Sequence, residues 1–295
     1  MMKTVFVTGS NSGLGLATVR LFASKGWRVI ASMRRLDQSG VLDGIENVLV
    51  LRLDVTDGDS IAQAFRESID RYGKIDVLVN NAGYCLLGTF ETTTLEQIRQ
   101  QFETNVFGLM AVTQAFLKHC RENSGCRIVN IASISADNGY PFVAAYAPSK
   151  AAVAMFSEVL NVEMHDAGVQ VKAVHPGLFR TEIFDSSKLK SSGKVPAVYR
   201  PMLDRFLAMQ RSWPAGEAEE CARVVFRAAT DNRPDRVHYY AGRDAIMLRR
   251  LKRLLGPEAA FELIKRIFTH GISRWMRWFL PKASTTVDLD SGSLI

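Results

Sequence analysis

A hydroxyl, a phenol and an amine stand close together in one short stretch of the chain. Ser133 begins the stretch, and Tyr146 and Lys150 end it, with Pro148 between them. Proline is tolerated only in the first turn of a helix, so we expect a helix to begin near Tyr146. Residues four apart share a helix face, which places the amine one turn below the phenol. A cation there favours the phenolate, so the spacing predicts a proton-transfer pair; an ordinary helix start with a surface lysine fits the same spacing.

Strand-like and helical patterns alternate along most of the chain. The strand-like runs are short, apolar and rich in valine and isoleucine, which is typical of parallel strands buried on both faces. The alternation predicts an α/β fold, a doubly wound, Rossmann-like parallel sheet of about seven strands with helices on both faces. We expect strands at 3–8, 27–33, 48–53, 75–80, 127–132, 169–174 and 237–241, and helices at 14–25, 57–71, 95–121, 147–166, 198–210, 216–230, 244–255 and 258–280.

Three regions are predicted from the patterning. Residues 1–242 form one catalytic domain, and its irregular stretch at about 178–215 is expected to be a substrate loop, because long inserts with little structure are often functional. A basic helical extension covers 243–282, and a flexible tail covers 283–295. The net charge of +7 resides in the extension, which carries ten basic and three acidic residues. The remaining body is neutral and has no nucleic-acid-reading motif, so no nucleic-acid partner is expected.

Cysteine usage and the N-terminus indicate a cytoplasmic protein. The four cysteines show no pairing or metal-ligand spacing, and the five histidines form no metal motif, so we expect no metal. His175, directly before Pro176, is expected to be structural. No signal-like leader precedes the first strand, and no run of about 18 apolar residues occurs.

The carboxyl ends of parallel strands are where such sheets bind ligands. After the first strand, three glycines would let the backbone turn tightly and approach a diphosphate at the next helix N-terminus; a plain strand–helix turn needs only one glycine. After the second strand, Arg34 and Arg35 replace the acidic residue that would bind a ribose. Guanidinium groups bind phosphate, so we expect NADP(H) rather than NAD(H), with Arg34 the stronger candidate; a solvated arginine pair is the alternative. Asp54 could accept from adenine or cap the next turn.

Several motifs occur together in one order. They are T-G-x-x-x-G-x-G at 8–15, Asp-Val at 54–55, N-N-A-G at 80–83, Asn105 in Thr-Asn-Val-Phe-Gly, Ser133, Y-x-x-x-K at 146–150 and P-G-x-x-x-T at 176–181. Through these motifs the first 180 residues resemble the short-chain dehydrogenase/reductase family, of the kind with a single-domain Rossmann core. The last third resembles that family only in general plan.

The resemblance implies hydride transfer between a ketone or aldehyde and an alcohol. It implies Tyr146 as the general acid in reduction, Ser133 as a donor to the substrate oxygen, and Lys150 as the group that lowers the pKa of the phenol and holds the nicotinamide ribose. Asn105 would hold a water that links Lys150 to solvent, and a homodimer or homotetramer is the family default. Strand ends and resemblance together give these cofactor-binding candidates: Gly9, Ser10, Asn11, Ser12, Gly13, Leu14, Gly15, Arg34, Arg35, Asp54, Val55, Asn81, Ala82, Gly83, Tyr146, Lys150, Pro176, Gly177, Leu178 and Thr181.

The substrate is a small carbonyl or alcohol that the sequence does not name. Residues that flank the catalytic ones are candidates for its cavity wall, although each could equally pack in the core. Their apolar character favours a hydrophobic substrate. They are Cys85, Ser135, Phe142, Phe179 and Phe184, together with Leu86, Leu87, Tyr140 and Val143. A non-catalytic NADP-binding sensor or scaffold is the competing function, and the intact catalytic set argues against it.

The extension carries apolar residues at helical spacing. They are Phe261, Ile264, Phe268, Ile272, Trp275 and Phe279. A basic amphipathic helix of this kind could lie on an anionic membrane surface. We favour the alternative that the helix packs back over the substrate mouth or against a second subunit, because apolar stripes usually face a core.

Overall fold

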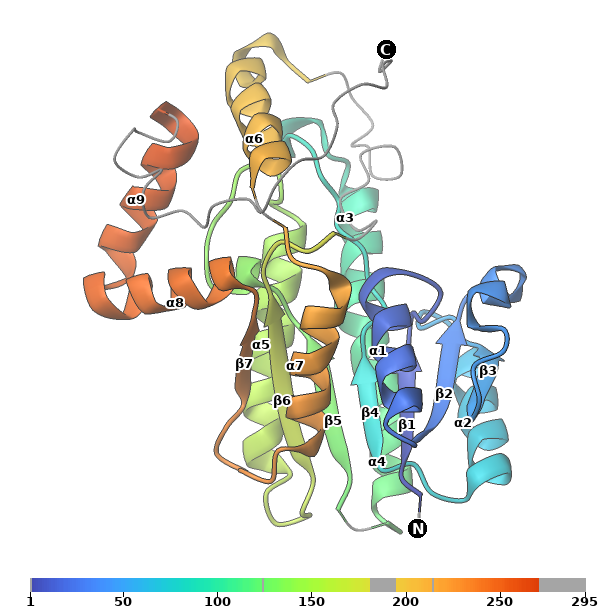
Figure 1. Cartoon of the computed structure of the whole chain (residues 1–295). Helices are drawn as coiled ribbons and strands as arrows, with labels where there is room; N and C mark the ends of the chain where they lie inside the picture. The colour runs from blue at the N-terminus through green and yellow to red at the C-terminus, as the bar shows by residue number, and fades with distance from the viewer. Residues whose placement is uncertain (1, 124, 181–194, 214, 271–295) are drawn as a thin grey trace.

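Seven parallel strands form one sheet in the computed structural model, which describes residues 2–123, 125–180, 195–213 and 215–270 (Figure 1). The strand order is β3-β2-β1-β4-β5-β6-β7. The chain therefore winds outward from β1 in one direction, returns to β4 and winds outward in the other, which confirms the doubly wound sheet. The strands are β1 (Thr4–Thr8), β2 (Arg28–Met33), β3 (Val48–Arg52), β4 (Val77–Asn80), β5 (Arg127–Ile131), β6 (Gln170–Pro176) and β7 (His238–Ala241).

Helices cover both faces of this sheet, as the sequence predicts. Helices α1 and α7 pack side by side on one face, and α2, α4 and α5 lie on the other (Figure 1). The helices are α1 (Gly13–Ser24), α2 (Gly58–Tyr72), α3 (Leu95–Phe102), α4 (Leu109–Cys120), α5 (Tyr146–Glu163), α6 (Arg200–Ser212), α7 (Ala218–Thr230), α8 (Arg243–Leu255) and α9 (Pro257–His270), with 3-10 turns at Leu36–Leu42, Phe90–Thr92, Ile134–Ala136 and Ala197–Tyr199.

The sheet separates two apolar layers. All five residues of β1 are buried. Val5 and Val7 point toward α1 and α7, whereas Phe6 points to the other face and stacks on Phe65 of α2 at 4.9 Å. Apolar side chains on both sides of a strand bury the most surface, which explains why the strands lack a polar face.

The long helix expected at 95–121 contains a π turn over Glu103–Gly108, between α3 and α4. At Gly108 a side chain has no room, since a Cβ atom would lie 2.8 Å from Cγ2 of Val55 and 2.9 Å from its carbonyl oxygen. The helix therefore presses against the loop after β3. A π turn of this kind is common at functional sites, and this one contains Asn105.

Helices α6, α8 and α9 gather beyond the carboxyl edge of the sheet (Figure 1). Helix α6 begins two residues after its expected start, and α9 follows the predicted break at Gly256-Pro257. The stripe residues Ile264 and Phe268 are buried among aromatic side chains of the body. This packing is the one favoured from the sequence; Ile272, Trp275 and Phe279 lie outside the described residues. Within the described ranges, no helix is both long and apolar enough to cross a membrane.

Candidate active site

In the loop after β1, two of the glycines stand where a Cβ atom has no space. Gly9 has φ +68°, and a Cβ atom there would lie 2.8 Å from Cα of Ala82. A Cβ on Gly15 would collide with the Gly9 carbonyl oxygen. The amide of Asn81 donates to the carbonyl oxygens of Thr8 and Gly9, both at 2.9 Å, and so clamps the loop. Helix α1 begins at the end of this loop without a side-chain cap, which leaves its first N–H groups available to an anion. The loop therefore fits a diphosphate.

A cleft of about 1320 Å³ crosses the carboxyl ends of the strands below this loop. Nearly all of the predicted cofactor residues line it. They are Gly9, Asn11, Ser12, Gly13, Leu14, Gly15, Arg34, Arg35, Asp54, Val55, Asn81, Ala82, Gly83, Tyr146, Lys150, Pro176, Gly177 and Leu178. Ser10 is a correction: it is fully buried, and its hydroxyl donates to the Val7 carbonyl oxygen at 2.9 Å, so it does not reach the cleft. Thr181 lies outside the described residues.

The two arginines after β2 are exposed and line one end of the cleft. Asp54 lies near them and caps the turn that follows, and its place in the cleft leaves contact with adenine a prediction. Its Oδ1 accepts from the N–H and hydroxyl of Thr56, at 3.0 and 2.8 Å, and its side chain also lines the cleft. Burial raises the pKa of Asp54, but the Thr56 hydrogen bonds and the charge of Arg34 outweigh burial and leave that pKa below its usual value.

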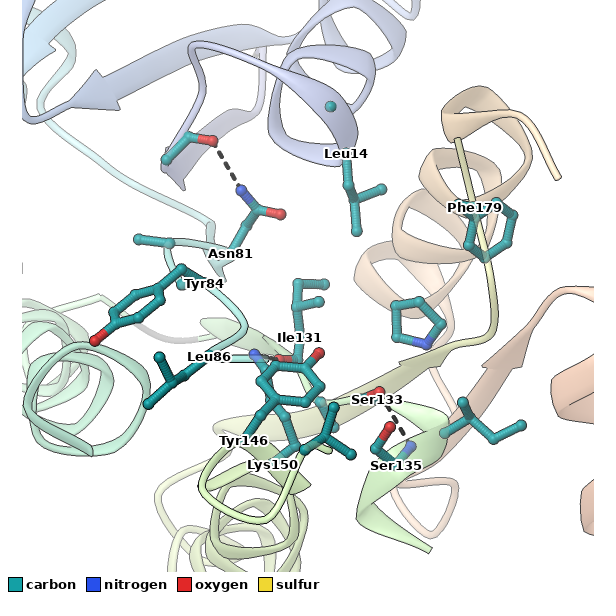
Figure 2. Close-up of a pocket in the computed structure, with 18 of the residues that line it drawn as sticks. Leu14, Asn81, Tyr84, Leu86, Ile131, Ser133, Ser135, Tyr146, Lys150 and Phe179 are labelled. Carbon is teal, nitrogen blue, oxygen red and sulfur yellow. Dashed lines mark hydrogen bonds between the residues drawn. The ribbon is translucent and has the colours of Figure 1, made fainter. Parts of the chain in front are cut away.

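Tyr146, Lys150 and Ser133 meet on one side of the cleft, opposite Leu14 and Asn81 (Figure 2). Helix α5 begins at Tyr146, as the position of Pro148 predicts, and both Tyr146 and Lys150 are buried on it. The Lys150 Nζ donates to the Ile131 carbonyl oxygen at 2.8 Å and lies 5.9 Å from the centre of the Tyr146 ring. The hydroxyl of Ser133 accepts from the N–H of Ser135 at 3.0 Å and faces the phenol.

The sequence predicts that the Lys150 cation lowers the pKa of Tyr146, but burial acts in the opposite direction. Burial of the phenol raises its pKa above the ordinary value of 10, and the hydrogen bond with Ser133 lowers it only in part. Lys150 is also buried, and burial lowers its pKa to about 8. The Lys150 Nζ lies over the Tyr146 ring, 5.9 Å from its centre, and desolvation of the phenol is the largest influence on the pKa of Tyr146 in this structure.

Asn105 lies behind the cleft and not in its wall. It is fully buried, and its amide nitrogen donates to the Tyr84 carbonyl oxygen at 2.9 Å and to the Ser149 hydroxyl at 3.2 Å. Gly83 separates it from the lysine: a Cβ there would lie 2.9 Å from Oδ1 of Asn105 and 3.5 Å from Nζ of Lys150. The π turn thus brings Asn105 close to the Lys150 amine.

His175 contacts the backbone of Ser133. Its Nδ1 is 3.1 Å from the Ser133 carbonyl oxygen, and its Nε2 is 2.9 Å from Nδ1 of His238. The ring of Tyr240 stacks on it at 4.6 Å. Because a carbonyl oxygen can only accept, Nδ1 of His175 carries the proton. The structural role expected for His175 is therefore to hold the backbone of Ser133.

Some predicted substrate residues reach the cleft and some do not. Ser135 and Phe179 line it, as do Leu86, Tyr140 and Val143. Cys85 does not: it is fully buried beside Tyr146, where burial raises its pKa to about 12. Phe142 does not line it either; its ring packs on Phe206 at 5.5 Å. Phe184 lies outside the described residues.

Comparison with known proteins gives the family. The family described as short chain dehydrogenase matches residues 3–191, which is more than half of the chain. The chain belongs to this family. This short-chain dehydrogenase is similar to the uncharacterised oxidoreductase YusZ of Bacillus subtilis (strain 168). The two sequences are 34% identical over 90% of this chain and 99% of the YusZ chain.

Solved structures of similar proteins agree with the fold of this short-chain dehydrogenase. A short-chain dehydrogenase from Streptomyces avermitilis is 31% identical, with a TM-score of 0.75 over 90% of this chain and 98% of its own. ElxO with NADP bound is 25% identical, with a TM-score of 0.70 over 84% of this chain and 100% of its own. A member from Burkholderia phymatum in complex with NAD reaches a TM-score of 0.74 over 86% of this chain and 95% of its own at 23% identity. The fold alone therefore does not choose between NADP and NAD.

One residue of the cleft of this short-chain dehydrogenase, Asp244, was not predicted from the sequence. Asp244 lines the cleft just after β7, and its Oδ2 accepts from the N–H of Leu178 at 2.7 Å. A Cβ on Gly177 would collide with this carboxylate, so the loop after β6 rests directly on it. Burial raises the pKa of Asp244. The position of Asp244 is itself a signal, because it follows the end of the seventh strand, and ligands bind at the carboxyl ends of such strands.

Proposed function

We propose that this protein interconverts a hydrophobic ketone or aldehyde and its alcohol by hydride transfer with NADP(H). The observation that carries the proposal is the meeting of Ser133, Tyr146 and Lys150 in one cleft below a glycine loop that fits a diphosphate. Ser133 follows β5, Tyr146 and Lys150 lie on α5, and the glycine loop follows β1.

The nicotinamide of the bound cofactor would supply or accept the hydride. Residues Gly9–Gly15 would hold its diphosphate, and the loop Pro176–Leu178, which rests on Asp244, would hold its carboxamide end. Tyr146 then donates its phenolic proton to the substrate oxygen as negative charge develops there, while Ser133 donates a hydrogen bond to the same oxygen. A phenol is protonated at neutral pH, so the proton of Tyr146 is available for this transfer.

Lys150 serves the same step from one helical turn away. Its pKa of about 8 keeps the amine charged at neutral pH, although burial makes that charge costly. A charged amine can donate to a ribose hydroxyl and stabilise the phenolate left after proton transfer. Asn105, on the far side of Gly83, would hold a water that returns a proton to Lys150.

The preference for NADP(H) rests on the end of β2. Arg34 and Arg35 are exposed at the cleft edge, directly after β2, where an acidic residue would accept a hydrogen bond from a ribose hydroxyl. A guanidinium offers two parallel donors to a phosphate, so either arginine suits a 2′-phosphate. Nδ2 of Asn11 donates a hydrogen bond to Oε1 of Gln38 at 2.8 Å, and this pair would form one side of the 2′-phosphate site.

The test is turnover by the full chain of a panel of aldehydes and ketones, followed by NADPH absorbance, with NADH as a control. We expect reduction with NADPH and at least tenfold lower kcat/KM with NADH. Tight NADPH binding without turnover of any carbonyl would contradict the proposal and favour a sensor. The homo-oligomeric state and the cytoplasmic location stay predictions from the sequence.

A further inference from the structure

A cluster of rings lies at the end of the cleft farthest from the two arginines. The ring of Phe206, on α6, is 5.5 Å from that of Phe142 and 6.0 Å from that of Phe268, on α9. The ring of Tyr140 meets Phe268 edge-on at 6.0 Å. Ile264, one turn before Phe268, is buried in the same cluster. Such ring pairs stabilise each other beyond the apolar area they bury, so these residues form a defined wall.

This wall belongs to the same cavity as the catalytic groups. Phe206, Ile264 and Phe268 line the cleft together with Tyr146 and Lys150. Helix α9 is fixed to α6 by a hydrogen bond, in which Nε of Arg205 donates to the Phe268 carbonyl oxygen at 2.9 Å. Ile264 and Phe268 of α9, which lies beyond the end of the sheet, therefore form part of the cavity wall.

Phe142 shows that the wall is held under strain. Its φ is +67°, a conformation that costs a bulky residue roughly 1–3 kcal/mol. The carbonyl oxygen of Phe142 accepts from the N–H of Gly88 at 2.9 Å, which fixes the loop before α5. Phe142 packs on Phe206, so the strained backbone at Phe142 indicates that the fold keeps the aromatic wall in this position at a cost in stability.

The charges of the cleft restrict what the wall can bind. Among the described lining residues, the cations are Arg34, Arg35 and Lys150, and the first two lie at the opposite end. Among the described residues that line the cleft near the ring cluster, the charged one is Asp244, whose carboxylate already accepts from Leu178; Arg205 lies beside the cluster, but its Nε donates to the Phe268 carbonyl oxygen and it does not line the cleft. A carboxylate or phosphate on the substrate would be desolvated here with no cation among the described lining residues near the rings to pair with it, which is costly.

We propose that α6 and α9 form a specificity wall, centred on Phe206 and Phe268, for an uncharged carbonyl compound with a large apolar substituent. The carbonyl carbon lies at Tyr146, and the substituent extends along the rings. This inference rests on the proposed function and adds the part of the substrate that the enzyme selects. It also assigns a role to α9. From the sequence, the extension could cover the substrate mouth, a second subunit or a membrane surface.

The test is a series of methyl ketones from 2-butanone to 2-decanone with NADPH. We expect kcat/KM to rise about three- to fourfold for each added methylene until the chamber is filled. A keto acid of matched length, with a terminal carboxylate, should be at least 100-fold poorer than its uncharged counterpart.

Two variants on one helix locate the effect. Phe268→Ala should lower kcat/KM for the best long ketone roughly 10- to 100-fold and leave 2-butanone within about twofold. Phe261→Ala is the matched control, because that side chain is 55% exposed whereas Phe268 is 5% exposed. If Phe268→Ala does not fold, Phe268→Leu should give a smaller loss in the same direction.

The outcomes separate the two proposals. Turnover that does not depend on chain length, or equal effects of the Phe261 and Phe268 variants, overturns the specificity wall and leaves the proposed function standing. A lack of turnover with every ketone, while NADPH still binds, overturns the proposed function and the wall with it.

Discussion

Asn105 and Tyr84 are joined by a reciprocal pair of hydrogen bonds. The N–H of Tyr84 donates to Oδ1 of Asn105 at 3.0 Å, and Nδ2 of Asn105 donates back to the Tyr84 carbonyl oxygen at 2.9 Å. The pair ties the π turn to the loop after β4, and Gly83 in that loop is adjacent to Lys150. Asn105 thus positions the backbone beside the Lys150 amine.

Asn105→Ala should lower both stability and turnover. The N–H of Tyr84 loses its partner, whereas the Tyr84 carbonyl oxygen keeps the hydrogen bond from Gln101, so the free energy of unfolding should fall by about 1–3 kcal/mol. We expect kcat to fall roughly 10- to 100-fold, because Lys150 loses its adjacent support. Urea unfolding and steady-state kinetics measure the two effects.

Gln101→Ala is the matched control for Asn105. Gln101 is also fully buried, accepts from the N–H of Leu86 at 2.7 Å and donates to the same Tyr84 carbonyl oxygen at 2.8 Å. It should lose a similar amount of stability and keep most of its kcat. Equal losses of kcat in the two variants would show that Asn105 has only a structural role.

Arg34→Ala should weaken NADPH binding and spare NADH binding. Loss of one charge-assisted hydrogen-bonding group predicts a rise in Kd for NADPH of roughly 10- to 100-fold, with less than a threefold change for NADH. Fluorescence titration of the two cofactors measures it. Arg52→Ala, an exposed arginine at the end of β3, is the control and should change neither. A parallel loss for NADPH and NADH would remove this explanation of cofactor choice.

Lys150→Met should stabilise the protein without cofactor at neutral pH. The lysine has a pKa of about 8 in the fold and 10.5 in the unfolded chain, so between these values the unfolded chain binds more protons. Wild-type stability therefore rises as the pH goes from 8 to 10.5. The variant lacks this cost but leaves the Ile131 carbonyl oxygen unpaired, so its net gain below pH 8 is about 2 kcal/mol.

Urea unfolding at pH 7 and pH 9.5 checks the behaviour of Lys150→Met. Its advantage over the wild type should be largest at pH 7 and should shrink at pH 9.5. A variant less stable than wild type at both values would mean that the buried amine does not carry the expected cost.

His175→Asn should change how acid unfolds the protein. Burial lowers the pKa of His175 below its unfolded value of about 6.5, so the fold holds it neutral and wild-type stability falls as the pH drops below that value. Asparagine can still donate to the Ser133 carbonyl oxygen and does not titrate. The neighbouring groups Asp137, Glu158, His238, Tyr240 and Arg249 stay in both proteins.

The difference between the two proteins isolates the titration of His175. Between pH 6.5 and pH 5 the stability of His175→Asn relative to wild type should rise by about 2 kcal/mol. Urea unfolding at several pH values measures it. Curves that stay parallel over this range would contradict a neutral, buried His175.

The sheet and the start of α5 were predictable because their causes are local. Apolar runs of strand length permit few alternatives to a buried parallel strand, and Pro148 restricts where a helix can begin. The π turn at Asn105 was not predictable, because it depends on the contact between Gly108 and Val55, which are distant in sequence.

The errors at the site have a common physical origin. Cys85 and Phe142 are next to site residues in sequence, but neighbouring side chains in a loop point in different directions, and both face the core. The pKa of Tyr146 was predicted from its charged neighbour alone, whereas burial dominates it. Burial depends on α5, β5 and the loops between them together, so spacing along one helix does not reveal it.

The central claim is that Tyr146 gives its proton to the substrate oxygen. The most direct measurement is single-turnover reduction of a methyl ketone by Tyr146→Phe with NADPH, together with the NADPH Kd. The account predicts a loss of at least 10³-fold in the reduction rate, because acid catalysis of this kind contributes about 10²–10⁴-fold, with a Kd within about threefold of wild type. A variant that reduces the ketone at the wild-type rate would contradict it.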